Sequence, residues 1–249
     1  MVGSLLLETI YTFVIVACCA VIQKHARCLS DLSGHQGIRC FQKAFSYWGL
    51  GFLIRYLYIL GINNPTFYGA SNNSILIIIS IFFEYLISLG GFFLVYSLIW
   101  RQMDQVSPSF AARYRMLALH VLAIAIALAD VSLGTFHFLF VVQILALGYA
   151  ALLAYDHWKK NQEKSVKNTF ASLYLIALIA ALIGYIINYV AQFLISNYPS
   201  IVIITYILTA SIFLIMLFGV LRIVHSGSYC DRCCPAFNKK QNGKKTRKA

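Results

Sequence analysis

Three charged side chains and one histidine interrupt otherwise apolar stretches of the sequence, namely Glu8, Arg55, Glu84 and His120. An ionisable group costs about 2.5–3.5 kcal/mol at the centre of a membrane helix, so each is a candidate for function. At 1.5 Å per residue, Arg55 lies about 10 Å from the end of its stretch, compared with about 6 Å for Glu8 and 15 Å for Glu84. We therefore predict that Arg55 pairs with Glu84, Glu8 or both.

Three interpretations of Arg55 remain open from the sequence. The charge pair can fix the register of neighbouring helices, or it can form part of a pocket for a ligand or ion. Alternatively, Arg55 can extend its apolar stem so that the guanidinium reaches the membrane surface. His120, standing alone, is typical of a buried, hydrogen-bonded histidine.

Other polar side chains fall at similar depth. Ser80 and Glu84 are four residues apart, as are Asn188 and Gln192, so each pair shares one face of a helix. Such groups form either a ligand site or hydrogen bonds between helices. The candidate network of ligand-binding or ion-pairing residues comprises Glu8, Arg55, Ser80, Glu84, Gln143, Asn188 and Gln192.

Three cysteines, Cys230, Cys233 and Cys234, follow the last apolar stretch. Their spacing matches half of a zinc site, but a single half-motif is too little to predict a metal, and we predict no cofactor. Cysteines beside a basic tail favour S-acylation and attraction to anionic lipid headgroups, or simply a disordered tail. The lipid-contacting residues of this tail would be Lys239, Lys240, Lys244, Lys245, Arg247 and Lys248.

The elements that position these residues follow from composition. The chain has 249 residues, of which 60% are hydrophobic and only 11% charged, whereas soluble domains carry about 25% charged residues. A membrane span needs roughly 20 apolar residues. Seven such stretches occur, at 4–22, 44–62, 74–99, 114–130, 135–155, 169–196 and 200–224.

We predict an all-α membrane protein in which residues 1–225 form seven transmembrane helices and residues 226–249 form a tail. The split at Asp130–Gly134 rests on length, because one helix over Met116–Tyr155 would be about 60 Å long. Asp130 and His137 flank this turn and are expected to be hydrated. A polar loop is expected at residues 23–43.

Charge gives the orientation. Nineteen of the twenty Lys and Arg residues fall on one side of a seven-span model, in the loops at 23–43, 101–113 and 156–168 and in the tail or just beside them. Since cytoplasmic loops are rich in Lys and Arg, we predict an external N-terminus and a cytoplasmic tail. All seven cysteines then face the reducing side, where free thiols are expected. The net charge of +12 thus reflects topology, and we expect no nucleic-acid partner.

Several heptahelical classes are excluded by their chemistry. A retinal protein needs a Schiff-base lysine in its last helix, and residues 201–224 contain none. No nucleophile–base pair or metal cluster indicates an intramembrane enzyme. We therefore expect a non-enzymatic membrane protein of receptor or sensor type that acts through a cytoplasmic partner. The alternative is a small transporter or channel subunit with its site around Arg55 and Glu84.

Two segments carry a resemblance. The second stretch begins FQKAFSYWGLGF over residues 41–52, and the last ends FGVLR over residues 218–222. In these segments and in its short outer loops, the chain resembles prokaryotic seven-helix sensor input modules of the kind found before histidine kinases. The resemblance implies a ligand-sensing membrane bundle, and it assigns a role to no individual residue.

Overall fold

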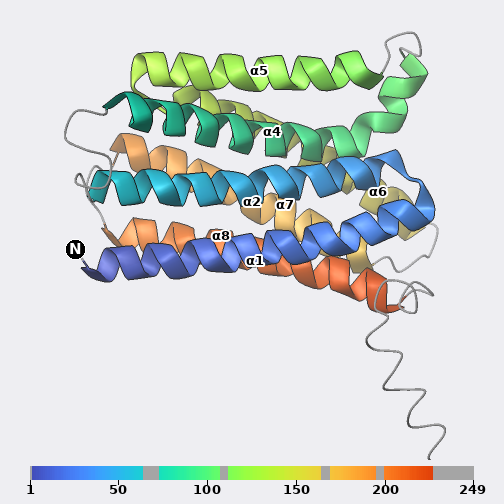
Figure 1. Ribbon diagram of the computed structural model, residues 1–249. Helices are drawn as coiled ribbons and strands as arrows, with labels where there is room; N and C mark the ends of the chain where they lie inside the picture. The colour runs from blue at the N-terminus through green and yellow to red at the C-terminus, as the bar shows by residue number, and fades with distance from the viewer. Residues whose placement is uncertain (1, 64–72, 107–111, 164–168, 195–198, 227–249) are drawn as a thin grey trace, which may run out of the picture.

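A computed structural model describes residues 2–63, 73–106, 112–163, 169–194 and 199–226 (Figure 1). These residues are helical apart from the short breaks at 34–35 and 134–136. The helices are α1 (Val2–Ser33), α2 (Gln36–Asn63), α4 (Asn73–Val106), α5 (Ala112–Leu133), α6 (His137–Glu163), α7 (Thr169–Leu194) and α8 (Pro199–Ser226).

The helices run up and down through one bundle. In Figure 1 the start of α1 lies at the same end as the last residues of α2, α5 and α7, and we call this the N-terminal end of the bundle. The last residues of α1, α4, α6 and α8 lie at the opposite, C-terminal end.

Four helices extend well beyond the predicted spans: α4 reaches Val106 and α6 reaches Glu163, within the loops expected at 101–113 and 156–168, and the change is largest for α1 and α2. α1 reaches Ser33 and α2 begins at Gln36, so the polar loop expected at 23–43 is wrong and nearly all of that segment is helical. Alanine, lysine, arginine and glutamine are good helix formers, so polarity alone does not end a helix. The break falls at Gly34, whose φ of 63° suits glycine in the left-handed region.

Six helices form a closed ring. α2 packs on α1 and α4, α6 packs on α4 and α7, and α8 closes the ring by packing on both α7 and α1. α5 lies outside this ring, where it contacts α4 and α6 (Figure 1). The sequential up-and-down connections therefore produce a six-helix wall with one peripheral helix.

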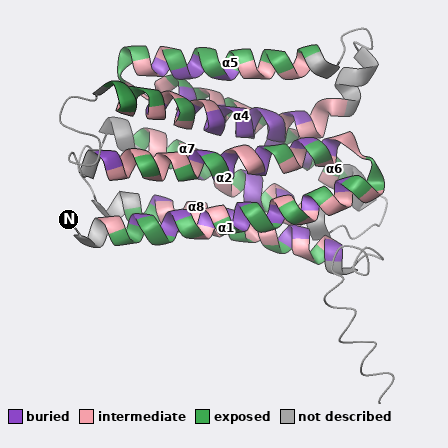
Figure 2. Cartoon of the chain, viewed as in Figure 1, coloured by how far each residue is buried: buried purple, intermediate pink, exposed green. Residues whose placement is uncertain are grey.

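Burial agrees with a bundle in an apolar solvent. Figure 2 shows the buried residues concentrated along the middle of α4, where every residue from 86 to 94 is buried. Large apolar side chains such as Leu117, Val121 and Leu128 of α5 are more than half exposed. Lipid tails are as apolar as leucine, so such side chains are stable on the outside of a membrane bundle.

Six of the described helices are long and apolar enough to cross a membrane, which establishes a polytopic membrane protein. Among the seven described helices, α2 falls outside this group. Its polar and weakly apolar residues, including Tyr47, Trp48, Arg55, Tyr56 and Tyr58, lower the hydropathy of a segment that is otherwise apolar.

Candidate ligand site

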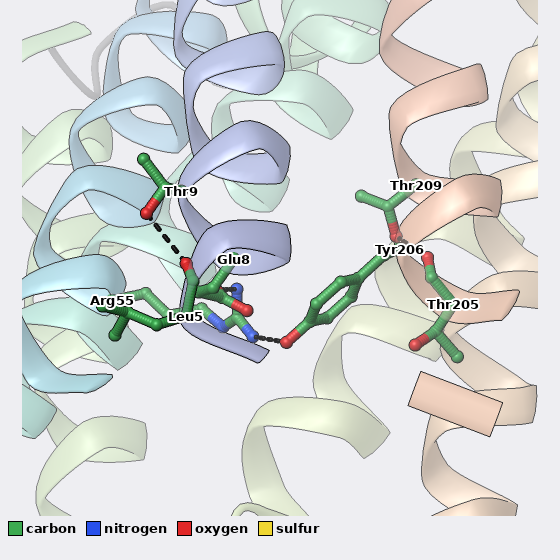
Figure 3. Close-up of polar contacts among 7 residues, drawn as sticks. All are labelled: Leu5, Glu8, Thr9, Arg55, Thr205, Tyr206 and Thr209. Carbon is green, nitrogen blue, oxygen red and sulfur yellow. Dashed lines mark hydrogen bonds and ion pairs between the residues drawn. The ribbon is translucent and has the colours of Figure 1, made fainter. Parts of the chain in front are cut away.

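Arg55 of α2 lies between α1 and α8 near the N-terminal end of the bundle (Figure 3). Its Nη1 donates to Oε1 of Glu8 at 2.5 Å, and its Nη2 donates to the hydroxyl of Tyr206 at 3.0 Å. The Glu8 side chain is only 4% exposed and that of Arg55 is 21% exposed. The ion pair is therefore shielded from solvent by three helices, α1, α2 and α8.

Aromatic rings surround this ion pair. Tyr11 of α1 and Tyr206 of α8 stack with their ring centroids 4.2 Å apart. The Arg55 guanidinium carbon lies 5.4 Å from each centroid, within the range at which ring faces attract cations. The next residues along the same two helices, Thr9 of α1 and Tyr56 of α2, are also joined, by a hydrogen bond of 3.0 Å between their hydroxyls. The network thus joins the first helix to the last.

Glu84 belongs to a separate region. Its Oε1 accepts a hydrogen bond from Ser80 at 3.1 Å, and its Oε2 is buried without a partner among the described residues. Arg55 forms its ion pair with Glu8 instead. The predicted pairing of Arg55 with a carboxylate therefore falls on Glu8, and the structure does not bring Glu84 into contact with Arg55.

Gln143 of α6 lies at a contact where α2, α4 and α6 meet. Its Nε2 donates to the carbonyl of Ile87 at 3.1 Å, and the indole nitrogen of Trp48 donates to the same carbonyl at 3.3 Å. A Cβ added at Gly90 would overlap the Trp48 ring, and one added at Gly91 would overlap the Gln143 amide. The glycine pair therefore lets α2 and α6 approach α4 closely.

A cavity of about 360 Å³ lies along the axis of the ring. All six ring helices contribute to its wall, and α5 contributes nothing. Its polar lining includes Arg55, Asn188, Thr205 and Thr209, all in the part nearer the N-terminal end. Aromatic and aliphatic side chains make up most of the rest, which is typical of sites for small molecules.

Packed side chains close the cavity toward the C-terminal end. The wall residues nearest that end include Phe45, Leu178 and Met216. One helical turn further toward that end, Phe41 packs against Phe45 with centroids 4.8 Å apart and against Tyr174 at 6.2 Å. Tyr174 is buried, as is Val220 four residues after Met216.

The predicted polar residues are therefore divided among three places. Arg55 and Asn188 line the cavity, and Glu8 supports Arg55 from behind. Ser80, Glu84 and Gln143 lie outside the cavity wall. The side chain of Gln192 lies outside the described residues, although its backbone belongs to α7.

The sequence analysis missed the role of Asp130. We expected it to be hydrated, but it is fully buried, and its two carboxylate oxygens accept hydrogen bonds from the backbone N–H groups of Phe138 and Leu139 at 2.9 and 2.6 Å. It thus caps α6 from the end of α5, across the break at Gly134. An acidic residue shortly before a helix start was the available signal.

His120 has neighbours that agree with a structural role. Its Nδ1 is hydrogen-bonded to the Tyr85 hydroxyl at 2.6 Å. Its ring also lies edge-on to Tyr47 and Phe93. This cluster joins α5 to α4 and α2, away from the cavity.

The cysteines are only partly described. Cys18, Cys19 and Cys40 are free and buried, whereas Cys28 is disulfide-bonded, so the expectation of free thiols is wrong for Cys28. The described part of the chain contains no group of three side chains suited to a metal ion. Cys230, Cys233, Cys234 and the basic tail residues lie outside the described residues.

Comparisons with known proteins assign the chain to no family. No protein-family model matches the sequence, and the search of curated proteins found no match.

Proposed function

We propose that the chain is a non-enzymatic seven-span receptor or sensor whose axial cavity binds a small molecule. The observation that carries this proposal is the cavity itself, which is ligand-sized and lined by six helices, with the packed rings of Phe41, Phe45 and Tyr174 toward its C-terminal end. A closed cavity suits binding better than conduction. Among the described residues, its wall contains no Asp, Glu, His or Cys, and a site without these groups offers little for acid–base or metal catalysis.

The proposal counts α2 as a membrane span, which brings the six apolar spans to seven. α2 packs between α1 and α4 in the ring, and its exposed residues beyond Lys43 are Leu50, Leu53 and Leu57. A span that shows lipids only this narrow leucine stripe can tolerate polar residues on its other faces. The pairing of Arg55 with Glu8 offsets the cost of placing that charge in the bilayer.

With seven spans, the charge segregation sets an external N-terminus and a cytoplasmic tail. The polar end of the cavity then lies in the outer half of the membrane, and its apolar end extends toward the cytoplasmic side. The ligand would enter from outside or from the outer leaflet, and a cytoplasmic protein would read the inner loops and the tail. The tail lysines would hold that region near anionic headgroups.

A transporter is less well supported. Transport sites are typically built from discontinuous helices, whereas the ring helices run unbroken through the described ranges. Moreover, the site proposed for a transporter combined Arg55 with Glu84, and these two residues belong to different regions.

Ligand binding tests the proposal directly. The purified protein is screened by thermal unfolding against a panel of small lipophilic and charged compounds. Binders should raise Tm for the wild type but not for Ala181→Phe, which fills the cavity. Ala125→Phe is the matched control, because Ala125 is exposed on α5. Equal stabilisation of both variants, or no binder at all, would contradict a ligand site in the cavity.

Two further experiments test orientation and transport. Reporters fused at Asn64 or Asn72 should read as external, and reporters at Lys164 or Lys240 as cytoplasmic; finding Asn72 and Lys164 on one side rules out seven spans. In proteoliposomes, a compound that raises Tm should show no protein-dependent flux. Measurable flux would favour the transporter instead.

A further inference from the structure

We propose that the cavity selects a neutral lipophilic molecule carrying one hydrogen-bond acceptor, such as a carbonyl group, directed at the Arg55 guanidinium. This inference rests on the proposed function and specifies the chemistry of its ligand.

The wall dictates a lipophilic body. Between Arg55 and Met216 the cavity is bounded by aromatic rings, among them Trp48, Phe52 and Phe213. Phe213 packs edge-to-face on each of the other two rings, with its centroid 5.9 Å from that of Trp48 and 5.7 Å from that of Phe52. A polar group placed against this surface would lose its hydration without gaining a hydrogen bond.

The polar end supplies donors. A guanidinium carries five N–H bonds, and Arg55 uses two of them, for Glu8 and Tyr206. Arg55 itself lines the cavity, and Asn188 across the ring forms no hydrogen bond within the described part of the chain. A ligand acceptor at this end would accept hydrogen bonds from the remaining N–H groups of Arg55 and from the Asn188 amide.

Charge decides between a neutral and an anionic acceptor. Glu8 already neutralises Arg55, and Glu8 lies behind the wall rather than in it. A carboxylate ligand would bring a second negative charge beside Glu8, and both carboxylates would have only Arg55 as a counter-charge. In a setting of low dielectric constant, the uncompensated charge would be costly. A neutral carbonyl accepts the same hydrogen bond without that cost.

The cavity also fixes the direction in which the ligand lies. Thr205 and Met216 mark its two ends along α8, and eleven residues of helix span about 16 Å. The acceptor should therefore lie near Arg55 and Tyr206, and the apolar remainder of the ligand should point toward Met216.

Benzophenone is a suitable probe, because on irradiation its carbonyl oxygen takes a hydrogen atom from a nearby C–H group and its carbonyl carbon then bonds to that carbon, which records where the carbonyl lies. The full-length protein is photolabelled and the sites are mapped by mass spectrometry. We expect labels on the cavity-facing residues around Tyr206, Thr209 and Asn188. Preferential labelling at Leu178, or labelling spread over the lipid-facing residues, would overturn the proposed direction.

Competitors of similar size test the acceptor and the charge. Phenyl benzoate, which has a neutral carbonyl, should block labelling at about one-tenth the concentration required of diphenylmethane, which has no acceptor. Diphenylacetate, the anionic competitor, should be no better than diphenylmethane. Equal potency of the first two, or superior potency of the anion, would overturn the proposal.

Two variants separate this inference from the proposed function. Ala181→Phe should abolish cavity labelling, while Glu8→Leu with Arg55→Leu should retain it but lose the tenfold preference for phenyl benzoate. If the double variant does not fold, Asn188→Leu should reduce the preference instead. If Ala181→Phe leaves the labelling unchanged, the ligand site itself is contradicted. If Ala181→Phe abolishes the labelling but the wild type shows no preference for phenyl benzoate, only the proposed ligand chemistry is contradicted.

Discussion

Glu8 and Glu84 are both buried carboxyl groups on helices that flank α2, yet the structure holds them in opposite ways. Glu8 contacts a cation and, through Arg55, a third helix. Glu84 has a serine on its own helix and an oxygen without a partner among the described residues. A buried carboxyl group therefore says little about function until its partners are known, and the two regions should respond differently to mutation.

The largest effect is expected at the ion pair. Arg55→Leu leaves Glu8 buried without a counter-charge, which should cost about 3–5 kcal/mol of unfolding free energy in detergent. Adding Glu8→Leu should restore much of the loss, because apolar replacement of both partners can be nearly neutral. Adding Glu84→Leu should restore nothing. Rescue by Glu84→Leu would break the distinction between the two regions.

A smaller effect is expected where α4 meets α6. Gly91→Ala places a methyl group on the Gln143 amide, and such overpacking typically costs about 1–3 kcal/mol. Gln143→Ala in the same chain should recover part of the loss by making room. Gly148→Ala is the matched control, because nothing lies within 4 Å of its added Cβ. Unfolding in detergent measures all three, and equal losses at Gly91 and Gly148 would argue against close packing at α4.

Asp130→Ala removes the cap of α6 and should cost about 1–2 kcal/mol. Asp130→Asn keeps one acceptor oxygen and should lose less. The comparison uses the same unfolding assay, supplemented by hydrogen exchange at Phe138 and Leu139, whose amides should exchange faster in the alanine variant. Unchanged exchange at both amides would show that the cap contributes nothing.

The smallest effect is expected for Glu84→Gln. Glu84 contacts no cation in the described structure, so a neutral group of the same shape should change stability by less than about 0.5 kcal/mol. The matched change Glu8→Gln removes the counter-charge of Arg55 and should destabilise the protein clearly. Similar losses for both variants would show that Glu84 has an ionic partner after all.

The sequence predicted where the helices lie along the chain better than it predicted which residues and helices contact one another. Apolar stretches locate membrane helices because each must cross the same thickness of hydrocarbon, and seven stretches correspond to seven described helices. Helix ends beyond the apolar stretches were missed, since residues 23–33 and 36–43 are polar yet helical. Hydropathy reports the solvent around a segment rather than its backbone conformation.

The site was harder to predict for a related reason. Depth along a helix placed Arg55 between two carboxylates, but depth contains no information about which face of each helix meets its neighbour. The choice of Glu8 over Glu84, the contact with Tyr206 and the exclusion of α5 from the ring all depend on helix order around the axis. Likewise, the cap made by Asp130 depends on the geometry of one turn.

The position of the ion pair along the chain bears on biogenesis. Glu8 and Arg55 lie on the consecutive helices α1 and α2, so each charge can meet its partner within one helical hairpin, before α4 to α8 are made. The contact of Arg55 with Tyr206 must wait for α8, which also closes the ring against α1. Completion of the cavity is thus coupled to the synthesis of α8, and a chain that lacks α8 would retain its paired charges but have no site.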